Sequence, residues 1–291
     1  VRPRVASQRG ARVDYEVPAS VASRIVAVAR EQNVTPFMVV HAALAVLLAR
    51  LSASGDIAVG TPIAGRGRPE LDPLIGMFVN TLVLRTQVDP DMSFDELIEQ
   101  VRRTDLDAFA NADVPFETLV ERLQPARSEA FAPFAQVWLT LGQTVLPEFG
   151  SGGPSSVADL ELTPLDPVST PAKVDLLIAL SVSTEGEPWI GSIVYATDLF
   201  DAVTVDAFAQ RLVAVLDSLT SAPETKVSAA PLVAEAERSQ IAGWSDGSRR
   251  GAVTALRSST DGPETLADLI ESAAVRFAPS TAGGFRDRGI P

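Results

Sequence analysis

Two polar side chains near the start of an apolar strand are the residues best placed for chemistry. Residues 75–85 read Ile-Gly-Met-Phe-Val-Asn-Thr-Leu-Val-Leu-Arg. The β-branched and apolar residues predict a buried strand over 78–88, with Asn80 and Thr81 near its beginning. A buried asparagine needs partners for four hydrogen-bonding positions, so Asn80 either closes a turn or faces a polar cavity.

The single histidine is the other candidate for acid–base chemistry. His41 lies in an apolar helical stretch without a carboxylate close in sequence, so we expect a packed or partly exposed helix residue. A serine–histidine–aspartate arrangement would have to use it. No Gly-Lys-Ser/Thr follows the glycines at 60, 65, 67 and 76, and no residues have metal-ligand spacing. We therefore assign no catalytic residue and no metal site.

Composition narrows the class of protein. The chain has 291 residues, 46% of them hydrophobic and 21% charged, which is typical of a globular protein. It has no cysteine, so disulfides and thiolate chemistry are excluded. The net charge of −13 repels phosphate backbones and acidic membranes, so we expect neither nucleic acid nor membrane as a partner. Without an apolar leader or a stretch long enough to cross a bilayer, we expect a cytoplasmic location.

The elements that must position these residues mix helices and strands without strict alternation, which predicts an α/β or α+β sheet layered with helices. Thr35 and Ser93 are expected helix N-caps, the second completed by Glu96 in a capping box. Thr204 is the expected cap of a long amphipathic helix. The predicted strands are 12–17, 56–64, 78–88, 134–141, 160–165, 174–182 and 189–196, and the predicted helices are 18–32, 36–54, 115–124, 234–244 and 265–277. Two further helices begin after Ser93 and at Thr204. The first carries Leu97, Ile98, Val101, Leu106 and Phe109 towards the core, and the second has Phe208, Leu212, Val215 and Leu219 on one face.

Composition changes after Pro223. Residues 245–263 are rich in Gly, Ser, Thr and Arg and read as a linker. We therefore predict one compact domain over residues 1–222 and a lightly attached tail over 223–291.

Three ordered segments resemble core motifs of the condensation domains of nonribosomal peptide synthetases. Residues 75–85 are similar to the fifth motif, with its Gly, Phe-Val-Asn-Thr and later Arg, here Gly76, Phe78 and Arg85. Residues 111–117, Asn-Ala-Asp-Val-Pro-Phe-Glu, are similar to the sixth, with Ala112 in place of Gln. Residues 127–134 resemble the seventh motif. This sequence has the motif's arginine and proline, as Arg127 and Pro133, but lacks its Ser-Arg-Asn centre.

The resemblance implies a chloramphenicol-acetyltransferase-like lobe, one of two that face each other across a channel. The motif His-His-x-x-x-Asp-Gly belongs to the other, N-terminal lobe and is absent from this sequence. We therefore expect a C-terminal lobe, followed by the linker and first helix of an adenylation domain. The implied reaction is amide formation between acyl groups on the phosphopantetheine arms of peptidyl carrier proteins, so the implied partners are carriers, the N-terminal lobe and an adenylation domain.

The resemblance also suggests roles for single residues. Phe78, Asn80 and Thr81 are the candidates to line the substrate channel. Arg85 is expected to pair with a carboxylate near the sheet, and Gly76 and Arg127 are motif residues of structural character. In the sixth motif, Asp113 is the expected cap of a helix that starts at Pro115, continues through Phe116 and carries Glu117 in its first turn.

Three interpretations remain open from sequence. The chain is half of a condensation enzyme, active only with a histidine-bearing lobe; or a non-catalytic docking or recruitment module; or an inactive truncated remnant. By itself, the chain is expected to be inactive, since its one imidazole lies in an apolar helix.

Overall fold

A computed structural model describes residues 1–67, 69–71, 73–126, 128–142, 155–157, 160–162, 170–184, 186–233 and 235–245. The chain divides into two compact units, Val1–Ala234 and Glu235–Pro291. Of the second unit, only α7 (Glu235–Ser245) is described.

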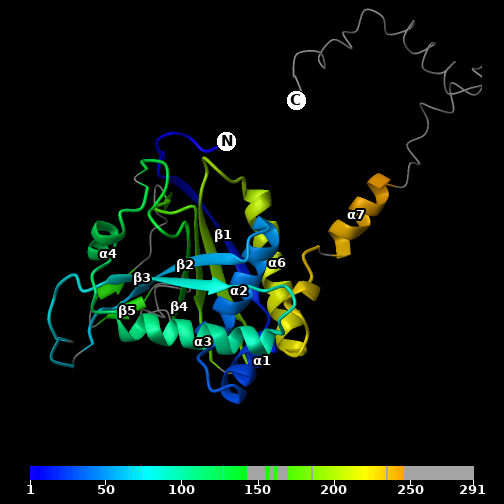
Figure 1. The fold of residues 1–291 in the computed structure, drawn as a ribbon, viewed down its shortest axis with the longest axis horizontal. Coiled ribbons are helices and arrows are strands. Elements are labelled where there is room, and N and C mark those ends of the chain that lie inside the picture. The colour runs from blue at the N-terminus through cyan, green and yellow to red at the C-terminus, as the bar shows by residue number, and fades with distance from the viewer. Residues whose placement is uncertain are drawn as a thin grey trace, which may run out of the picture. The chain divides into compact units, whose positions relative to one another are not determined.

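The first unit is a mixed sheet layered with helices (Figure 1). Its strands are β1 (Arg9–Val17), β2 (Asp56–Ile63), β3 (Asn80–Gln87), β4 (Val137–Gly142), β5 (Ser155–Val157), β6 (Leu160–Leu162), β7 (Thr170–Pro171), β8 (Leu176–Ser181) and β9 (Trp189–Ala196). Its helices are α1 (Ala19–Glu31), α2 (Pro36–Ser52), α3 (Phe94–Ala110), α4 (Phe116–Leu123) and α6 (Ala202–Ser221), with 3-10 turns η1 (Pro69–Leu71) and η2 (Val227–Ala229).

Seven of the described strands form one sheet in the order β3-β2-β4-β8-β9-β1-β7. The pairs β2–β4 and β4–β8 are parallel, and the other neighbours are antiparallel. Strands β5 and β6 form a separate hairpin. The mixture confirms the predicted α/β sheet with helices.

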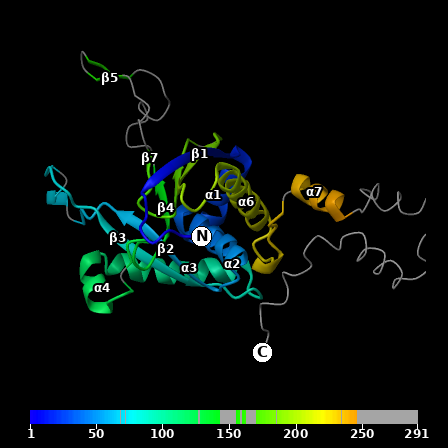
Figure 2. The ribbon, with the colours of Figure 1, turned by 90° about the horizontal axis from the view of Figure 1, so that it is seen from above.

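One face of this sheet forms the core with α1, α2, α3 and α6 (Figure 2). Alternate strand residues such as Leu139, Ile178 and Ile193 are fully buried there. Helix α2 supplies a run of buried residues from Met38 to Leu47, which agrees with a helix that is apolar on nearly every side. The strand residues between the buried ones point to the opposite face and are half-buried or exposed.

Of the helix caps expected at Thr35, Ser93 and Thr204, the first two are confirmed. Thr35 accepts a hydrogen bond from the backbone N–H of Met38, and Ser93 and Glu96 form the full capping box. The prediction for α6 was wrong, because the Asp201 carboxylate accepts from the backbone N–H of Thr204 and caps the helix. Asp201 comes three residues earlier and is the stronger acceptor.

Helix α3 buries a different face from the predicted one. Leu97, Ile98 and Val101 are buried as expected, but the exposed fractions of Leu106 and Phe109 are 46% and 40%. The buried face continues through Asp105, which is fully enclosed. Asp105 follows Val101 by four residues and so lies on the same side of the helix.

The compact unit also extends beyond residue 222, where we expected it to end. Val227 and Ala230 are buried in the main core. The Arg50 guanidinium donates to the carbonyls of Val227, Ser228 and Ala230, which fixes this segment to the end of α2. The composition shift after Pro223 shows where the periodic apolar pattern ends. It does not show where the compact unit ends, because a segment held through its backbone carbonyls needs no particular side chains.

Among the described residues, no single helix is long and apolar enough to cross a membrane. Helices α1 and α2 reach that length and hydrophobicity only as a pair, which is bent by 109°.

Candidate functional site

Asn80 begins β3 and has all four hydrogen-bonding positions occupied. Its Nδ2 donates to the carbonyls of Ala112 and Val114, each at 2.8 Å. Its Oδ1 accepts from the backbone N–H of Thr81 at 2.8 Å and of Phe116 at 3.1 Å. One side chain therefore joins the first strand residue to the connection between α3 and α4.

This arrangement corrects two expectations. Phe116 is the first residue of α4, so Asn80 supplies a hydrogen bond to the helix N-terminus that we assigned to Asp113. The N-cap residue of α4 is Pro115 and has no side-chain cap, while Glu117 lies in the first turn as predicted. The fifth and sixth motifs thus form one junction. The second correction concerns Asn80 itself, because its amide has no free hydrogen-bond donor or acceptor position left for a substrate.

A pocket of about 560 Å³ opens beside this junction. Asn80 and Phe78 line it, together with Asp113, Pro115 and Glu117. The Arg66 guanidinium lies 4.3 Å above the Phe78 ring, close enough for a cation–π contact. Gly65 allows this packing, because its φ is +63° and a Cβ there would lie 1.7 Å from the Phe78 carbonyl oxygen.

The approach to the pocket is apolar and exposed. Between β2 and β3 the chain reaches away from the sheet (Figure 2), and the exposed fractions of Ile75, Met77 and Val79 are 105%, 88% and 57%. Gly76 belongs to the same exposed stretch. Clustered exposed apolar side chains are typical of interaction sites.

Thr81 and Arg85 point to the sheet face away from the helices. Thr81 is half-buried and does not line the pocket beside Asn80. Arg85 makes a bidentate ion pair with Asp56 on β2, at 2.8 Å and 2.7 Å, so its predicted carboxylate partner is confirmed. Hydrogen bonding from Arg85 holds the pKa of the Asp56 carboxyl below its ordinary value.

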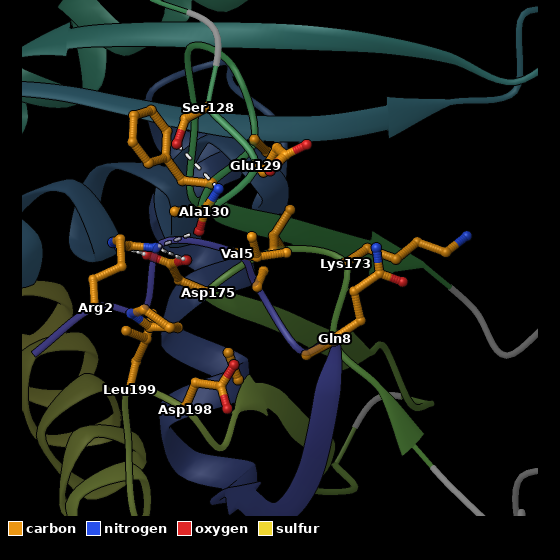
Figure 3. A pocket seen from close by; sticks show the side chains of 17 residues that line it. Arg2, Val5, Gln8, Ser128, Glu129, Ala130, Lys173, Asp175, Asp198 and Leu199 are labelled. Carbon is orange, nitrogen blue, oxygen red and sulfur yellow. Dashed lines mark hydrogen bonds and ion pairs between the residues drawn. The ribbon is translucent and has the colours of Figure 1, made fainter.

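The seventh motif packs against the beginning of the chain (Figure 3). The Arg2 guanidinium donates to the Asp175 carboxylate and, at 3.1 Å, to the Ala130 carbonyl, and it lies over the Phe131 ring. These residues line a pocket of about 440 Å³. Arg127 lies outside the described residues, so its role stays a prediction. Pro133 precedes Phe134, whose ring meets that of Phe116 edge-on at 5.9 Å and so joins this motif to α4.

His41 is fully buried in a polar cluster that sequence reasoning missed. Its Nδ1 lies 3.1 Å from Asp105 Oδ2, and its Nε2 lies 3.5 Å from Thr86 Oγ1. All three side chains are fully enclosed. The pairing joins α2, α3 and β3, and it withdraws the only imidazole from any pocket wall described above. A histidine inside an apolar helix was the one available signal that a distant polar partner is required.

No group of side chains in the described part of the chain is arranged to hold a metal ion.

Comparison with known proteins gives the family. The condensation-domain profile matches residues 1–242. Over 246 residues the chain is 43% identical to the isonitrile lipopeptide synthase of Mycobacterium tuberculosis, covering 83% of this chain and 10% of that protein. It is 37% identical over 244 residues to a dimodular nonribosomal peptide synthase of Bacillus subtilis, covering 82% and 10%. The chain spans about a tenth of the length of these relatives.

Solved structures agree with this likeness. A four-domain nonribosomal peptide synthetase bound to AMP and glycine superposes with a TM-score of 0.74 at 25% identity, over 80% of this chain and 18% of that one. The X-domain from teicoplanin biosynthesis gives a TM-score of 0.70 at 27% identity, over 79% and 51%. The chain therefore belongs to the condensation-domain family of nonribosomal peptide synthetases and has that family's chloramphenicol-acetyltransferase-like α/β fold.

Proposed function

We propose that this chain is one lobe of a condensation domain, and that it forms amide bonds between carrier-bound aminoacyl or peptidyl thioesters only when joined to a histidine-bearing lobe. One observation carries the proposal. The chain covers about half of a structurally similar domain, 51% of the X-domain from teicoplanin biosynthesis, while its one histidine is enclosed in the core. The acid–base group of the reaction is then supplied by the facing lobe.

In this proposal the chain contributes positioning rather than proton transfer. Holding two tethered reactants together gains much of the available rate advantage, because the encounter becomes effectively intramolecular. The pocket beside Asn80 and the exposed residues Ile75, Met77 and Val79 form the surface that meets the other lobe. Asn80 acts by fixing the junction between β3 and α4, not by contacting substrate. The phosphopantetheine arms of the carriers enter between the lobes and are not cofactors of this chain.

The tail has a separate role. We place residues 235–291 in the connection to an adenylation domain and its first helix, on the strength of the sequence from Glu235 to Trp244. The described helix α7 lies in this stretch. The partners that follow are the N-terminal lobe, peptidyl carrier proteins and an adenylation domain, in a cytoplasmic setting.

The test is reconstitution. This chain is mixed with a separately expressed N-terminal lobe and two loaded carriers, and dipeptidyl carrier is measured by mass spectrometry. We expect product from the complete mixture and none when either lobe is omitted. Stable association of the lobes without product would favour a docking module instead, and neither association nor product would favour an inactive remnant.

A further inference from the structure

The sheet face away from the helices carries a continuous row of apolar side chains. In the strand register, Val83 of β3 pairs with Gly60 of β2, Gly60 with Trp138 of β4, Trp138 with Leu177 of β8, and Leu177 with Val194 of β9. The last three side chains are half-buried rather than enclosed. The row therefore leaves apolar surface available at the middle of the sheet.

Trp138 is held in this row by a specific contact. A Cβ built on Gly60 would lie 2.6 Å from Trp138 Nε1 and 2.7 Å from its Cδ1, so the indole occupies the space that a side chain would need. The indole N–H points to the carbonyl of Ala135 at 3.4 Å. The glycine thus lets the largest side chain of the row lie against the neighbouring strand.

On the other side of Trp138, the row forms the wall of a pocket of about 330 Å³. Trp138, Leu177 and Val194 line it with Ala132, Pro171, Ala172, Lys173 and Val174. The volume is at the lower end of the range for small-ligand pockets, roughly 300–1,000 Å³. A space of this size accepts a side chain or a small group, and it is too small for a protein segment to dock.

The next row along the strands has different chemistry. Thr140 pairs with Ala179, and Ala179 with Ser192. This row lies about 6.6–6.8 Å from the apolar one, two residues along the strands, and offers two hydroxyl groups. Neither hydroxyl lines the pocket, whose lining is apolar except for Lys173, so the pocket itself fits the apolar side chain of an aminoacyl or peptidyl group.

We propose that this pocket receives the apolar side chain of a carrier-bound aminoacyl or peptidyl group, and that Trp138, set by Gly60, limits the side-chain length it accepts. The inference rests on the proposed function, since it names the substrate class of that reaction. Trp138 is a specificity-determining residue in this account, and Gly60 is a positioning residue that acts through the indole. Replacing Trp138 with a smaller residue lengthens the pocket, and a methyl group at Gly60 moves the indole and shortens it.

The test measures binding, for which only this chain is needed. N-acetyl-aminoacyl pantetheine amides with linear side chains, from alanyl through norvalyl to 2-aminooctanoyl, are titrated against the full chain. The dissociation constant is read from the NMR shifts of the Leu177 and Val194 methyl groups. We expect roughly fourfold tighter binding for each added methylene until the pocket is full, because each buried CH₂ contributes a similar free energy.

Variants then move the length limit in opposite directions. Trp138→Ala should shift the preference by about tenfold toward the longer side chains, and Gly60→Ala should shift it toward the shorter ones. Trp138→Leu repeats the first test with a milder change if the alanine variant fails to fold. Val83→Ala is the matched control, because Val83 lies in the same row but does not line the pocket. It should leave the series unchanged.

Three results would overturn the inference. The first is that the NMR shifts of the methyl groups do not depend on side-chain length, and the second is that folded Trp138 variants have the same length limit as the wild type. The third is that a glutamyl amide binds most tightly and that Lys173→Ala abolishes this binding. The last result would assign an acidic substrate to the Lys173 amine. Failure of the proposed function looks different. A length series in binding without product in the two-lobe reaction would keep the pocket and reject the reaction. Product formation with the same side-chain selectivity in the wild type and in Trp138 variants would support the reaction and reject the pocket.

Discussion

At the scale of single residues, Asn80 shows how a side chain that suits chemistry can serve architecture. The sequence required that a buried asparagine find partners for four positions, and it left a turn and a cavity as alternatives. The partners are 32 to 36 residues away for three of the four bonds, so their identity could not be seen in sequence. Arg85 was easier to predict, because an arginine on a strand of a sheet commonly pairs with a carboxylate on a neighbouring strand.

We predict that Asn80→Ala destabilises the compact unit by roughly 1–3 kcal/mol, because its removal leaves part-buried backbone groups without partners. For a domain of this size, the melting temperature should fall by about 2–4 °C for each kcal/mol. Thermal unfolding followed by circular dichroism measures the change. Thr81→Val is the control and should melt close to the wild type. An Asn80→Ala variant that melts with the wild type would contradict the structural role.

Arg85 should control the titration of Asp56. In the folded state the pKa of Asp56 is lowered from 3.8, chiefly by hydrogen bonds from Arg85. A lowered folded pKa contributes stability that is present above the unfolded pKa and is lost as pH falls through the folded value. Arg85→Met should therefore raise the Asp56 pKa toward 3.8, measured by carbon-13 NMR of the carboxyl. Both side chains are exposed, so the melting temperature at neutral pH should hardly move. An unchanged Asp56 pKa would refute the pairing.

At the scale of elements, periodicity predicted most helices and strands, while polar groups decided the details. The capping box of α3 depends on residues three apart and was visible in sequence. The buried pair of His41 and Asp105 spans 64 residues, and an aspartate on a helix is more often exposed, so that pair could not be predicted. The predicted end of the compact unit at residue 222 was wrong for a similar reason, since the Arg50 side chain donates to carbonyls 177 to 180 residues away.

Asp105→Ala should be among the more destabilising single changes on α3. It leaves the enclosed His41 Nδ1 without its carboxylate partner and opens a cavity between α2 and α3. We expect a loss of at least 1–3 kcal/mol in the free energy of unfolding, measured in urea. Asp107→Ala is the matched control, because Asp107 is exposed on the same helix and should change stability by less than about 0.5 kcal/mol. Equal midpoints for the two variants would rule out a structural role for the pair.

Arg50→Met tests how the segment at 223–233 is attached. The substitution keeps the apolar part of the side chain but removes the donor to the Val227, Ser228 and Ala230 carbonyls. In limited proteolysis, the wild-type chain should be cut first within 245–263, as the linker composition predicts. The variant should gain early cuts between 223 and 233. An identical cleavage pattern in both would mean that Arg50 does not hold the segment.

At the scale of the whole molecule, the two faces of the sheet differ in what covers them. One face, covered by α1, α2, α3 and α6, stabilises the unit and encloses His41. The other face and the β2–β3 connection leave apolar side chains half-buried or exposed, and these carry the proposed contacts with partners and substrate. Motif spacing predicted the family and the fold, because the three motifs are local in sequence. It did not predict the pocket beside Trp138, whose walls come from strands paired only in the folded sheet.

The central claim is that catalysis uses a histidine outside this chain and not His41. The most direct measurement is the rate of dipeptidyl product in the two-lobe mixture after replacing one histidine at a time. His41→Gln retains a hydrogen-bonding group in the core and is first checked for a cooperative thermal transition. The account predicts that this folded variant keeps the wild-type rate, whereas replacing the motif histidine of the N-terminal lobe abolishes product. Loss of product with folded His41→Gln, together with activity of the chain by itself, would contradict it.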